Sequence, residues 1–406
     1  MSFQQGLSGL AAAAKDLDVI GNNVANANTV GFKKSSALFA DVYAKSVSTS
    51  AGSGIGIGTT LAAVQQSFVQ GSLTVTGNQL DVAINGGGFF RLDNNGAVTY
   101  SRNGQFHLDK DGFIVTPTNA KVTGYPVSST GTIITSSPQP LQISVADITP
   151  QATANASIGL NLDSREAINA ATFDINDAST YNKATSMSVY DSLGNQHTVS
   201  TYYQKSAANT WKVYAAADGA VLSAGAAVGT LHFNSDGTFD AAGSTQPAIS
   251  IALTNGATTP LAFPILYNAS TQFGSVFGVN SLTQDGFASG KLAGYSLSGD
   301  GTIVGRYTNG QSRPLGQVVL SNFANPEGLQ SLGNNQWGET GASGGPLVGT
   351  PGSASLGSVE SGAVEESNVD LTQELVDMIT AQRIYQANAQ TIKTQDQVFN
   401  TLVNLR

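Results

Sequence analysis

Apolar residues at both ends of the chain recur at alternating spacings of three and four, the a/d pattern of a helix that packs against another helix. The seam near the N-terminus consists of Phe3, Leu7, Leu10, Ala14, Leu17, Gly21 and Val24. The seam near the C-terminus consists of Leu371, Leu375, Met378, Gln382, Tyr385, Ala389, Ile392, Asp396, Phe399 and Val403. The pattern predicts a helix at each end, and it indicates that these helices meet each other or meet further copies of the chain.

Between the two seams, the pattern is typical of short β-strands. Leu80, Val82 and Ile84 alternate with polar residues, and turn sequences rich in Asn, Asp and Gly recur after them. The pair Asn103-Gly104 predicts a type I′ hairpin between strands at 98–101 and 105–108. Further turns are predicted at 110–112, 191–195, 234–237, 299–301 and 309–310. These signals predict compact antiparallel β structure.

Changes in amino-acid composition along the chain predict nested domains. Pro-containing stretches at 136–140 and 149–150 place a boundary near residue 145. The expected parts are a terminal helical domain (1–24 and 370–406), a linker region (25–70 and 356–369), an inner β domain (71–145 and 285–355) and an inserted outer β domain (146–284). The predicted fold class is multidomain and mainly β, with α-helical N- and C-terminal segments that form a coiled-coil-like terminal domain and with nested, discontinuous β domains.

Local signals mark helix starts and flexible segments. Asp370, followed three residues later by Gln373, predicts an N-cap and a capping box for the C-terminal helix. The glycine-rich run from Gly52 to Gly58 predicts a hinge, because glycine accepts positive φ. Gly and Ser also crowd the segment from Gly338 to Gly352, which predicts a loop or linker.

Composition excludes several classes of protein. A chain of 406 residues is long enough for more than one domain, and only 11% of its residues are charged. With 18 basic and 27 acidic residues and no basic cluster, a nucleic-acid partner is not expected. The absence of Cys removes disulfides, thiolate nucleophiles and thiolate metal sites.

The sequence predicts neither a cleavable secretory signal nor insertion into a membrane. The first twenty residues lack the unbroken apolar run of a signal peptide, because they are interrupted by Gln4, Gln5, Lys15, Asp16 and Asp18. No stretch approaches the roughly 18 apolar residues of a membrane span. These features alone favour the cytoplasm unless a separate export route operates.

No residue pattern predicts catalysis, a metal site or a cofactor. The three His residues lack the spacing of metal ligands; they are His107, His197 and His232. The Gly-x-Ser-x-Gly match at 341–345 falls in a glycine-rich loop, without the strand and helix of a nucleophile elbow. Asp109 to Gly112 resembles the start of a calcium loop, but Thr118 stands where the bidentate Glu would fall, so a hairpin turn is predicted. An extracellular β-rich enzyme such as a glycosidase is the alternative from another class, and it would need two carboxylates that face one cleft.

The N-terminal seam runs into Asn22-Asn23-Val24-Ala25-Asn26 and then Thr29-Val30-Gly31-Phe32-Lys33, which resembles the signature of the bacterial flagellar rod and hook axial proteins. The segments 362–371 and 381–389 resemble the C-terminal motif of that family, and 76–84, 88–90 and 100–106 resemble its shared β domain. The motif residues carried over are Asn22, Asn23, Asn26, Gly31, Phe32, Asn368, Asp370, Gln382, Arg383, Tyr385 and Asn388. The insertion at about 146–284 and the total length resemble a hook-type member, and a stiff distal rod-type member is the alternative.

The resemblance implies a structural subunit that self-assembles into a curved tube, which acts as a flexible universal joint and passes torque from motor to filament. The terminal helices would drive this assembly through Phe3, Leu7, Leu10, Leu17, Val24, Leu371, Leu375, Met378, Tyr385, Ile392, Phe399 and Val403. The implied partners are further copies, the distal rod, a hook-cap scaffold, the hook-filament junction proteins and the flagellar export apparatus. The implied location is extracellular, within the flagellum, after export without a cleavable signal peptide. Neither a cofactor nor an enzymatic activity is implied.

Overall fold

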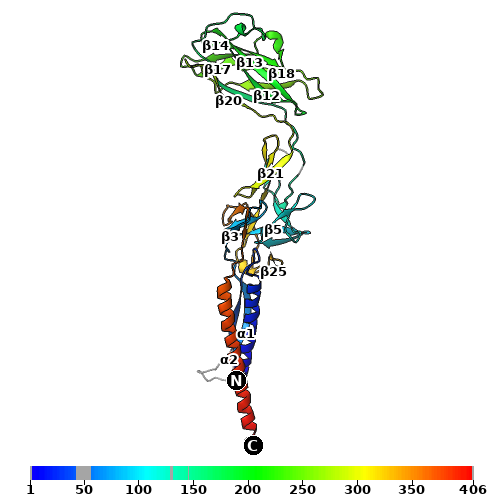
Figure 1. Ribbon diagram of the computed structural model, residues 1–406, viewed down its shortest axis with the longest axis vertical. Helices are drawn as coiled ribbons and strands as arrows, with labels where there is room; N and C mark the ends of the chain where they lie inside the picture. Colours follow the sequence, from blue (N-terminus) through cyan, green and yellow to red (C-terminus); the bar gives the residue numbers. More distant parts are fainter. Residues whose placement is uncertain (1, 43–55, 129–130, 145, 405–406) are drawn as a thin grey trace. The chain divides into compact units, whose positions relative to one another are not determined.

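The computed structural model describes residues 2–42, 56–128, 131–144 and 146–404. The chain separates into two compact units. Unit 1 consists of Met1–Ser144, Gly294–Arg306 and Ser312–Arg406, and unit 2 of Val145–Ala293 and Tyr307–Gln311. The predicted fold class is confirmed, since the described residues form mainly β structure with a helix near each end of the chain (Figure 1).

The terminal helices belong to unit 1 and lie side by side in opposite directions (Figure 1). Helix α1 is Ser2–Ala25 and helix α2 is Leu371–Asn404. Asn23, near the end of α1, contacts Glu374 in the first turn of α2, whereas Gly6 lies against Ile392. Because α2 has 34 residues and α1 has 24, α2 is roughly 15 Å longer at a rise of 1.5 Å per residue. The last turns of α2 therefore extend beyond the start of α1.

The start of α2 bears out only half of the predicted capping box. The Asp370 carboxylate accepts hydrogen bonds from the backbone N–H groups of Thr372 and Gln373 at 2.9 and 3.1 Å, so the N-cap is confirmed. The Gln373 side chain does not reach back to Asp370. Its amide instead donates to the Asp377 side chain, one turn further along α2, at 2.8 Å.

After α1 the chain forms an antiparallel hairpin that packs beside this helix. Its strands are β1 (Ser35–Val42) and β2 (Gly58–Gln66). Of the predicted hinge at 52–58, residues 52–55 lie outside the described residues. Gly56 accepts a hydrogen bond from Gln5 of α1 at 2.6 Å, and Thr59 donates to Ser8 of α1. The described end of this glycine-rich run is therefore held against α1 and is not a free hinge.

Two small sheets bring the returning chain alongside its outgoing part. In one, β3 (Leu73–Val75) pairs with β29 (Ala363–Glu365), and in the other β4 (Val82–Asn85) pairs with β28 (Ser358–Ser361). Both pairs are antiparallel. They join segments almost three hundred residues apart, so they fix the start and the end of the β part of unit 1 next to each other.

The large sheet has thirteen strands within the described residues, and its main path runs β21-β22-β23-β9-β5-β6-β26-β25. Its strands are β5 (Phe89–Asn94), β6 (Ala97–Ser101), β7 (His107–Leu108), β8 (Ile114–Val115), β9 (Lys121–Tyr125), β10 (Gln139–Pro140), β21 (Leu292–Leu297), β22 (Thr302–Tyr307), β23 (Ser312–Val318), β24 (Leu320–Asn322), β25 (Gln330–Gly333), β26 (Gln336–Gly338) and β27 (Leu347–Gly349). An aromatic cluster forms part of the core beside it: Phe68, Phe89, Tyr100, Phe323 and Trp337, in edge-to-face contacts.

The predicted hairpin at Asn103-Gly104 is wrong. Strand β6 pairs with β5 through a turn at Asn95-Gly96, where both residues have positive φ, as a type I′ turn requires. Asn103 instead accepts a hydrogen bond from the backbone N–H of Gln105. Gly104 serves a close approach, because a Cβ there would lie 1.7 Å from the Val82 carbonyl oxygen. The Asn-Gly pair at 95–96 thus forms a tight turn, whereas the glycine of the pair at 103–104 allows a close backbone approach.

Other predicted turns in the large sheet are confirmed. Residues 110–112 join β7 to β8, 299–301 join β21 to β22, and 309–310 join β22 to β23, each with a glycine at positive φ. The segment 338–352 is more ordered than the predicted linker. It contains β27, and the Ser343 side chain is fully buried, with its hydroxyl donating to the carbonyl oxygen of Thr340 at 2.8 Å.

Unit 2 is built from two sheets that share one apolar core. The six-stranded sheet of its described residues contains β12 (Lys183–Tyr190), β13 (Gln196–Ala207), β14 (Thr210–Ala217), β15 (Ala220–Val221), β16 (Gly229–Phe233) and β17 (Phe239–Thr245). The four-stranded sheet contains β11 (Ala156–Asn161), β18 (Ala248–Ile251), β19 (Leu261–Leu266) and β20 (Gly278–Gln284). Residues of both sheets, including Trp211, Tyr203 and Tyr267, pack into the core. The predicted turns at 191–195 and 234–237 are confirmed as the β12–β13 and β16–β17 connections.

Replacing Gly104 by Ala should lower the free energy of unfolding of unit 1 by about 1–3 kcal/mol, since the new methyl group overlaps the Val82 carbonyl. Chemical denaturation followed by fluorescence would measure the loss. Gly341→Ala is the matched control, because no heavy atom lies within 4 Å of the added Cβ and its φ is not positive. Equal stability of the two variants would contradict the assigned close approach.

Candidate self-assembly site

Helix α1 contacts α2 through a face that is displaced by one residue from the predicted seam. Its buried residues are Gly6, Ala13, Ile20 and Asn23. Of the predicted residues, Phe3 and Leu7 are 44% and 51% exposed, while Leu10, Leu17 and Val24 are half-buried. Small residues line the contact: Gly6 lies against Ile392, and Gly9 lies against the Asn388 side chain. The larger apolar residues are left at the edge of the helix pair.

Helix α2 exposes most of its predicted seam. Glu374 and Ala381 are buried, and Met378, Asn388 and Ile392 are half-buried. Most of the other predicted residues are exposed: Leu371 (47%), Leu375 (45%), Tyr385 (37%), Phe399 (58%), Gln382 and Arg383. Val403 lies within α2, but its side chain is outside the described part of the chain. The two helices therefore meet each other, as one of the two predicted arrangements requires. An apolar stripe on α2, formed by Leu371, Leu375 and Ile379, stays exposed among the described residues.

The Asn-rich motif ends α1 and fixes where the chain goes next. The buried Asn23 amide donates to Ser35 O at 2.8 Å and to Glu374 Oε2 at 3.1 Å, and its oxygen accepts from Ser35 N at 3.0 Å. Asn26 donates back to Asn22 O and Oδ1, and the Thr29 hydroxyl donates to Asn26 Oδ1. One amide side chain thus ties α1, β1 and α2 together.

The turn after this motif lies against the body of unit 1. Gly31 has a φ of 71°, and a Cβ there would lie 2.5 Å from the backbone nitrogen of Asn103. Its N–H donates to the Glu365 carbonyl at 2.8 Å. Glycine is required at this position both for its backbone conformation and for the close approach.

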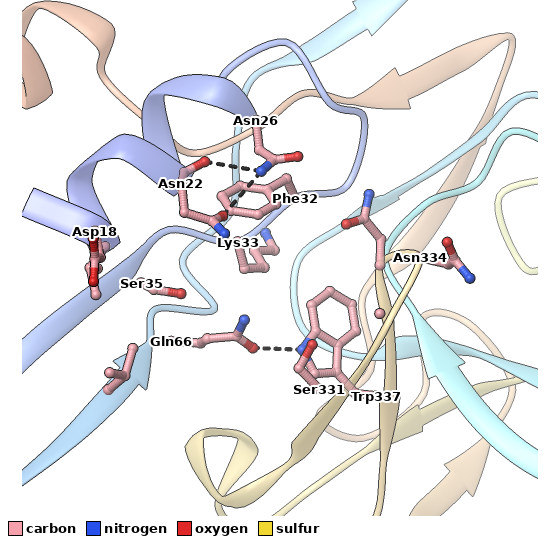
Figure 2. A pocket seen from close by; sticks show the side chains of 14 residues that line it. Asp18, Asn22, Asn26, Phe32, Lys33, Ser35, Gln66, Ser331, Asn334 and Trp337 are labelled. Atoms are coloured by element: carbon pink, nitrogen blue, oxygen red, sulfur yellow. Dashed lines mark hydrogen bonds between the residues drawn. The ribbon is translucent and has the colours of Figure 1, made fainter. Parts of the chain in front are cut away.

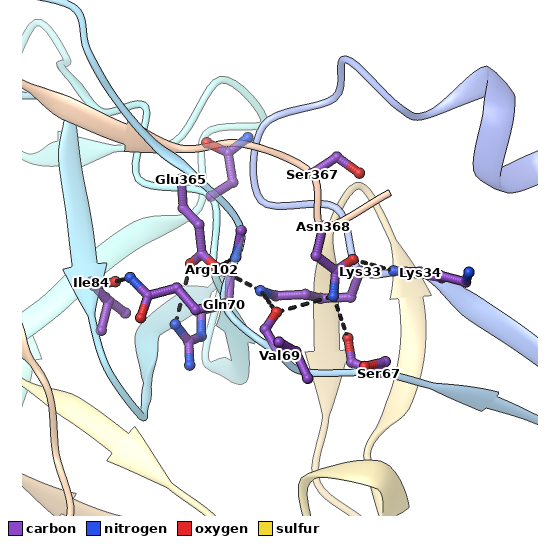
Figure 3. Close-up of polar contacts among 12 residues, drawn as sticks. Lys33, Lys34, Ser67, Val69, Gln70, Ile84, Arg102, Glu365, Ser367 and Asn368 are labelled. Carbon is purple, nitrogen blue, oxygen red and sulfur yellow. Dashed lines mark hydrogen bonds and ion pairs between the residues drawn. The ribbon is translucent and has the colours of Figure 1, made fainter. Parts of the chain in front are cut away.

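Lys33, Glu365 and Arg102 form a buried charged cluster (Figure 3). Lys33 Nζ lies 2.6 Å from Glu365 Oε1 and also donates to Val69 O at 2.9 Å. Arg102 Nη1 lies 3.2 Å from Glu365 Oε2. The side chains of Lys33 and Glu365 are 0% exposed, and that of Arg102 is 4% exposed. One carboxylate therefore pairs with two cations that come from different parts of the chain.

Asn368 extends this cluster toward α2. Its Oδ1 accepts from Lys34 N at 2.7 Å, and its Nδ2 donates to Ser67 O and Val69 O at 2.8 and 3.0 Å (Figure 3). The residue thus satisfies backbone groups of two segments that precede it by about three hundred positions.

Burial and ion pairing act in opposite directions within the cluster. Burial lowers the pKa of Lys33 and of Arg102, and the charge and hydrogen bond of Glu365 partly restore both values. The Arg102 charge further lowers the pKa of Lys33. Without the carboxylate, two cations would lie unpaired in an apolar setting, so Glu365 is the residue on which this arrangement depends.

A second charged group lies between α1 and α2. Glu374, 1% exposed, is paired with Lys34 at 2.5 Å. Burial raises the pKa of Asp16 on α1, and the nearby charges of Asp377 and Glu374 on α2 raise it further. The two helices thus face each other with carboxylates on both sides, an arrangement that weakens their pairing.

A pocket of about 390 Å³ opens between the end of α1, β2 and the β25–β26 hairpin (Figure 2). Its lining includes Asn22, Asn26, Phe32 and Trp337, and Trp337 Nε1 donates to Gln66 Oε1 at 2.6 Å. Motif residues Asn22, Asn26 and Phe32 are therefore brought together here, whereas Gln382, Arg383 and Tyr385 lie on α2. The lining contains one carboxylate, from Asp18, so it lacks the carboxylate pair of a glycosidase.

Among the described residues, neither the Gly-x-Ser-x-Gly match nor a group of metal-ligand side chains forms a further site. Ser343 of the Gly-x-Ser-x-Gly match is buried and hydrogen-bonded to the backbone. Among the described residues, no group of three or more His, Asp or Glu side chains could hold a metal ion. Within the same part of the chain, neither helix combines the length and the apolar character that a membrane span needs.

Lys33, Arg102, Glu365 and Glu374 were not singled out from the sequence as site residues. A usable signal was present, because charged residues make up only 11% of the chain and three of these four lie inside the recognised motifs or directly beside them. Their pairing could not be derived, since the partners of Glu365 are 332 and 263 residues away.

Comparison with known proteins identifies the family of this chain. Four family models match: the flagella basal body rod protein (3–33), the flagellar hook protein FlgE/F/G D1 domain (83–163), the flagellar basal body protein FlaE D2 domain (161–287) and the flagellar basal body rod FlgEFG protein C-terminal region (360–405). The flagellar hook protein FlgE of Salmonella typhimurium is 45% identical to this chain, with 100% of both chains covered. This chain belongs to the flagellar hook protein family.

Other members of the hook protein family also align with this chain over almost their whole length. The flagellar hook protein FlgE of Escherichia coli is 45% identical over 100% of both chains, and that of Borreliella burgdorferi is 31% identical over 100% of this chain and 99% of its own. The crystal structure of Helicobacter pylori flagellar hook protein FlgE2 has a TM-score of 0.54 and 14% identity, covering 71% of this chain and 99% of that chain. At that identity the likeness concerns the fold.

Replacing Glu365 by Ala in this hook family member should lower the free energy of unfolding of unit 1 by about 3–5 kcal/mol, because Lys33 and Arg102 would be left buried and unpaired. Denaturation monitored by Trp337 fluorescence would measure the change. Glu366→Ala is the control, since this exposed neighbour bonds only Thr74 through its side chain and should alter stability by less than about 0.5 kcal/mol. Losses of similar size in both variants would contradict the role given to the cluster.

Proposed function

We propose that this chain is the subunit of the flagellar hook, the curved tube that passes torque from motor to filament as a flexible universal joint. Membership of the hook protein family and the full-length similarity to its named members support this function. The role is structural, and the chain acts by polymerising with copies of itself within the flagellum.

The observation that carries the proposal is an exposed apolar stripe on α2. It consists of Leu371, Leu375 and Ile379, which are spaced four residues apart on one side of the helix and are 47%, 45% and 51% exposed. Further large side chains on other sides of α2 are 37–58% exposed: Val376, Ile384, Tyr385, Val398 and Phe399. Burying apolar surface contributes about 25 cal/mol per Å². A long helix with such a stripe therefore gains stability when further copies cover it. We propose that the seam residues on α1 and α2 form contacts between copies in the inner wall of the tube.

Bending during rotation requires contacts between subunits that can change their register. Only 11% of the residues are charged, so few ion pairs are available to fix one register. Small polar side chains on the β domains suit contacts that slide. We propose the linker, inner β and outer β domains predicted from the sequence as the layers between which this movement occurs.

The further partners proposed are the distal rod below the tube, the hook-filament junction proteins above it, a hook-cap scaffold during growth and the flagellar export apparatus. We propose an extracellular location within the flagellum, reached by export through the flagellar export apparatus. The chain has no Cys, so no disulfide could hinder the passage of an unfolded subunit.

Introducing a charge into the α2 stripe should block assembly. The double variant Leu375→Glu with Ile379→Glu should slow the elongation of hook seeds about tenfold or more, because burying unpaired carboxylates between copies is unfavourable. Electron microscopy of tube length against time would measure the rate.

Leu193→Glu is the matched control for that variant, because Leu193 is 56% exposed and lies in a turn of unit 2. It should elongate seeds at close to the wild-type rate. Normal curved tubes from the α2 variant would refute the proposed contact. Straight, stiff tubes from the wild-type chain would instead favour a distal rod-type function.

A further inference from the structure

One end of unit 2 contains a histidine whose two ring nitrogens both face carboxylates. His197 Nδ1 lies 2.6 Å from Asp218 Oδ2, and His197 Nε2 lies 3.4 Å from Asp191 Oδ2. The exposed fractions of these side chains are 13% for His197, 52% for Asp218 and 0% for Asp191. A neutral imidazole carries one N–H, so it donates to one carboxylate and turns a lone pair toward the other. Only the imidazolium form donates to both.

Asp191 is the more constrained of the two carboxylates. It follows β12, and its Oδ1 accepts from the backbone N–H groups of Leu193 and Asn195. Its Oδ2 accepts from the Asn195 amide at 2.9 Å and from the Asn255 amide at 2.6 Å. A buried carboxylate with these donors is held ionised, which makes a lone pair directed at it from His197 unfavourable.

These contacts connect both sheets of unit 2. Asp191 lies in the β12–β13 turn and Asp218 follows β14, so both belong to the six-stranded sheet. Asn255 lies between β18 and β19 of the four-stranded sheet. Asp218 Oδ1 also accepts from Thr198 N at 2.8 Å. The cluster therefore ties three connections at one end of the shared core.

We propose that Asp191, His197 and Asp218 form a pH-dependent latch that closes this end of unit 2 when His197 is protonated and loosens when it is not. The charged groups that face the ring are Asp191 from the β12–β13 turn and Asp218 from the turn after β14. Asn195 and Asn255, which complete the hydrogen bonds of Asp191, are uncharged. The latch lies outside the assembly helices, so it stands independently of the proposed function.

The electrostatic setting agrees with this assignment. Burial alone would lower the pKa of His197, but the hydrogen bonds and charges of Asp218 and Asp191 outweigh it and raise the pKa above the usual 6.5. Burial would raise the pKa of both carboxylates, but their hydrogen bonds outweigh it and lower the pKa of each.

The sign of the pH dependence follows from these directions. A raised histidine pKa gives stability that is complete below the unfolded value of about 6.5 and is lost as the pH rises through the folded value. Lowered carboxylate pKa values give stability that is present above about 3.9 and is lost as the pH falls through the folded values. Unit 2 should therefore be most stable at mildly acidic pH and weaken toward alkaline pH.

Nuclear magnetic resonance of the histidine rings in the full chain tests the protonation directly. The chain has three His residues, so the His107→Gln and His232→Gln variants assign the ring signals. The His197 midpoint should lie above pH 6.5, and Asp218→Asn should lower it. A wild-type midpoint at or below 6.5, or no change with Asp218→Asn, would overturn the latch.

The thermal stability of unit 2 tests the effect that the latch has on folding. The chain has two Trp residues, so Trp337→Phe leaves Trp211, in the core of unit 2, as the reporter. Between pH 6 and pH 9 the thermal unfolding midpoint should fall by a few degrees, and His197→Gln should remove at least half of that fall. His232→Gln, whose ring contacts the Thr210 hydroxyl, is the control and should keep the fall. An undiminished fall in His197→Gln would contradict the latch, and if this variant does not fold, the ring titration of the folded wild type decides.

Discussion

The Glu365 carboxylate is the contact on which the arrangement of unit 1 depends. It binds Lys33, which is 332 residues away in sequence, and Arg102, which is 263 residues away. Closing such long loops costs conformational entropy, although the cost grows only slowly with length. A buried ion pair adds little net stability, because desolvation offsets the attraction, but an alternative packing would leave a charge unpaired. The cluster therefore specifies which segments meet more than it stabilises them.

The contacts around Glu365 help to determine where the helices lie. Lys33 and Lys34 follow α1 closely, Glu365 and Asn368 precede α2, and Glu374 lies in its first turn. Once the Lys33–Glu365 pair and the Lys34–Asn368 hydrogen bond form, the end of α1 and the start of α2 are adjacent. The β3–β29 and β4–β28 pairs also hold the outgoing and the returning segments of the chain together, and β29 itself ends at Glu365. Polar contacts just outside the helices thus act together with the Asn23–Glu374 hydrogen bond between them to position the helix pair.

Local features of this fold were predictable from sequence, and contacts over long separations were not. The terminal helices, the Asp370 cap and the glycine turns follow from periodicity and backbone preference within a few residues. The hairpin predicted at Asn103-Gly104 was wrong, because a glycine is needed at position 104 for the close approach of the Val82 carbonyl, which belongs to another strand. The predicted seam was offset on α1 by one residue, since Gly6 and Gly9 allow a closer approach to Ile392 and Asn388 than Leu7 or Leu10 would. The segments that resemble the family motifs contain Lys33, Arg102 and Glu365, but the pairing of these residues required the structure.

The two faces of the helix pair differ in a way that bears on assembly. The inner contact combines Gly6, Gly9 and Ala13 of α1 with Ala381 and Asn388 of α2. These side chains bury little apolar area, and Asp16 faces the charges of Asp377 and Glu374. Larger apolar residues remain exposed outside this contact, among them Phe3 and Leu7 of α1 and Leu371, Leu375 and Ile379 of α2, and under the proposed function they are available for contact with other copies. Since helices draw most of their stability from the packing of an apolar face, this distribution favours helices that become fully ordered when subunits assemble.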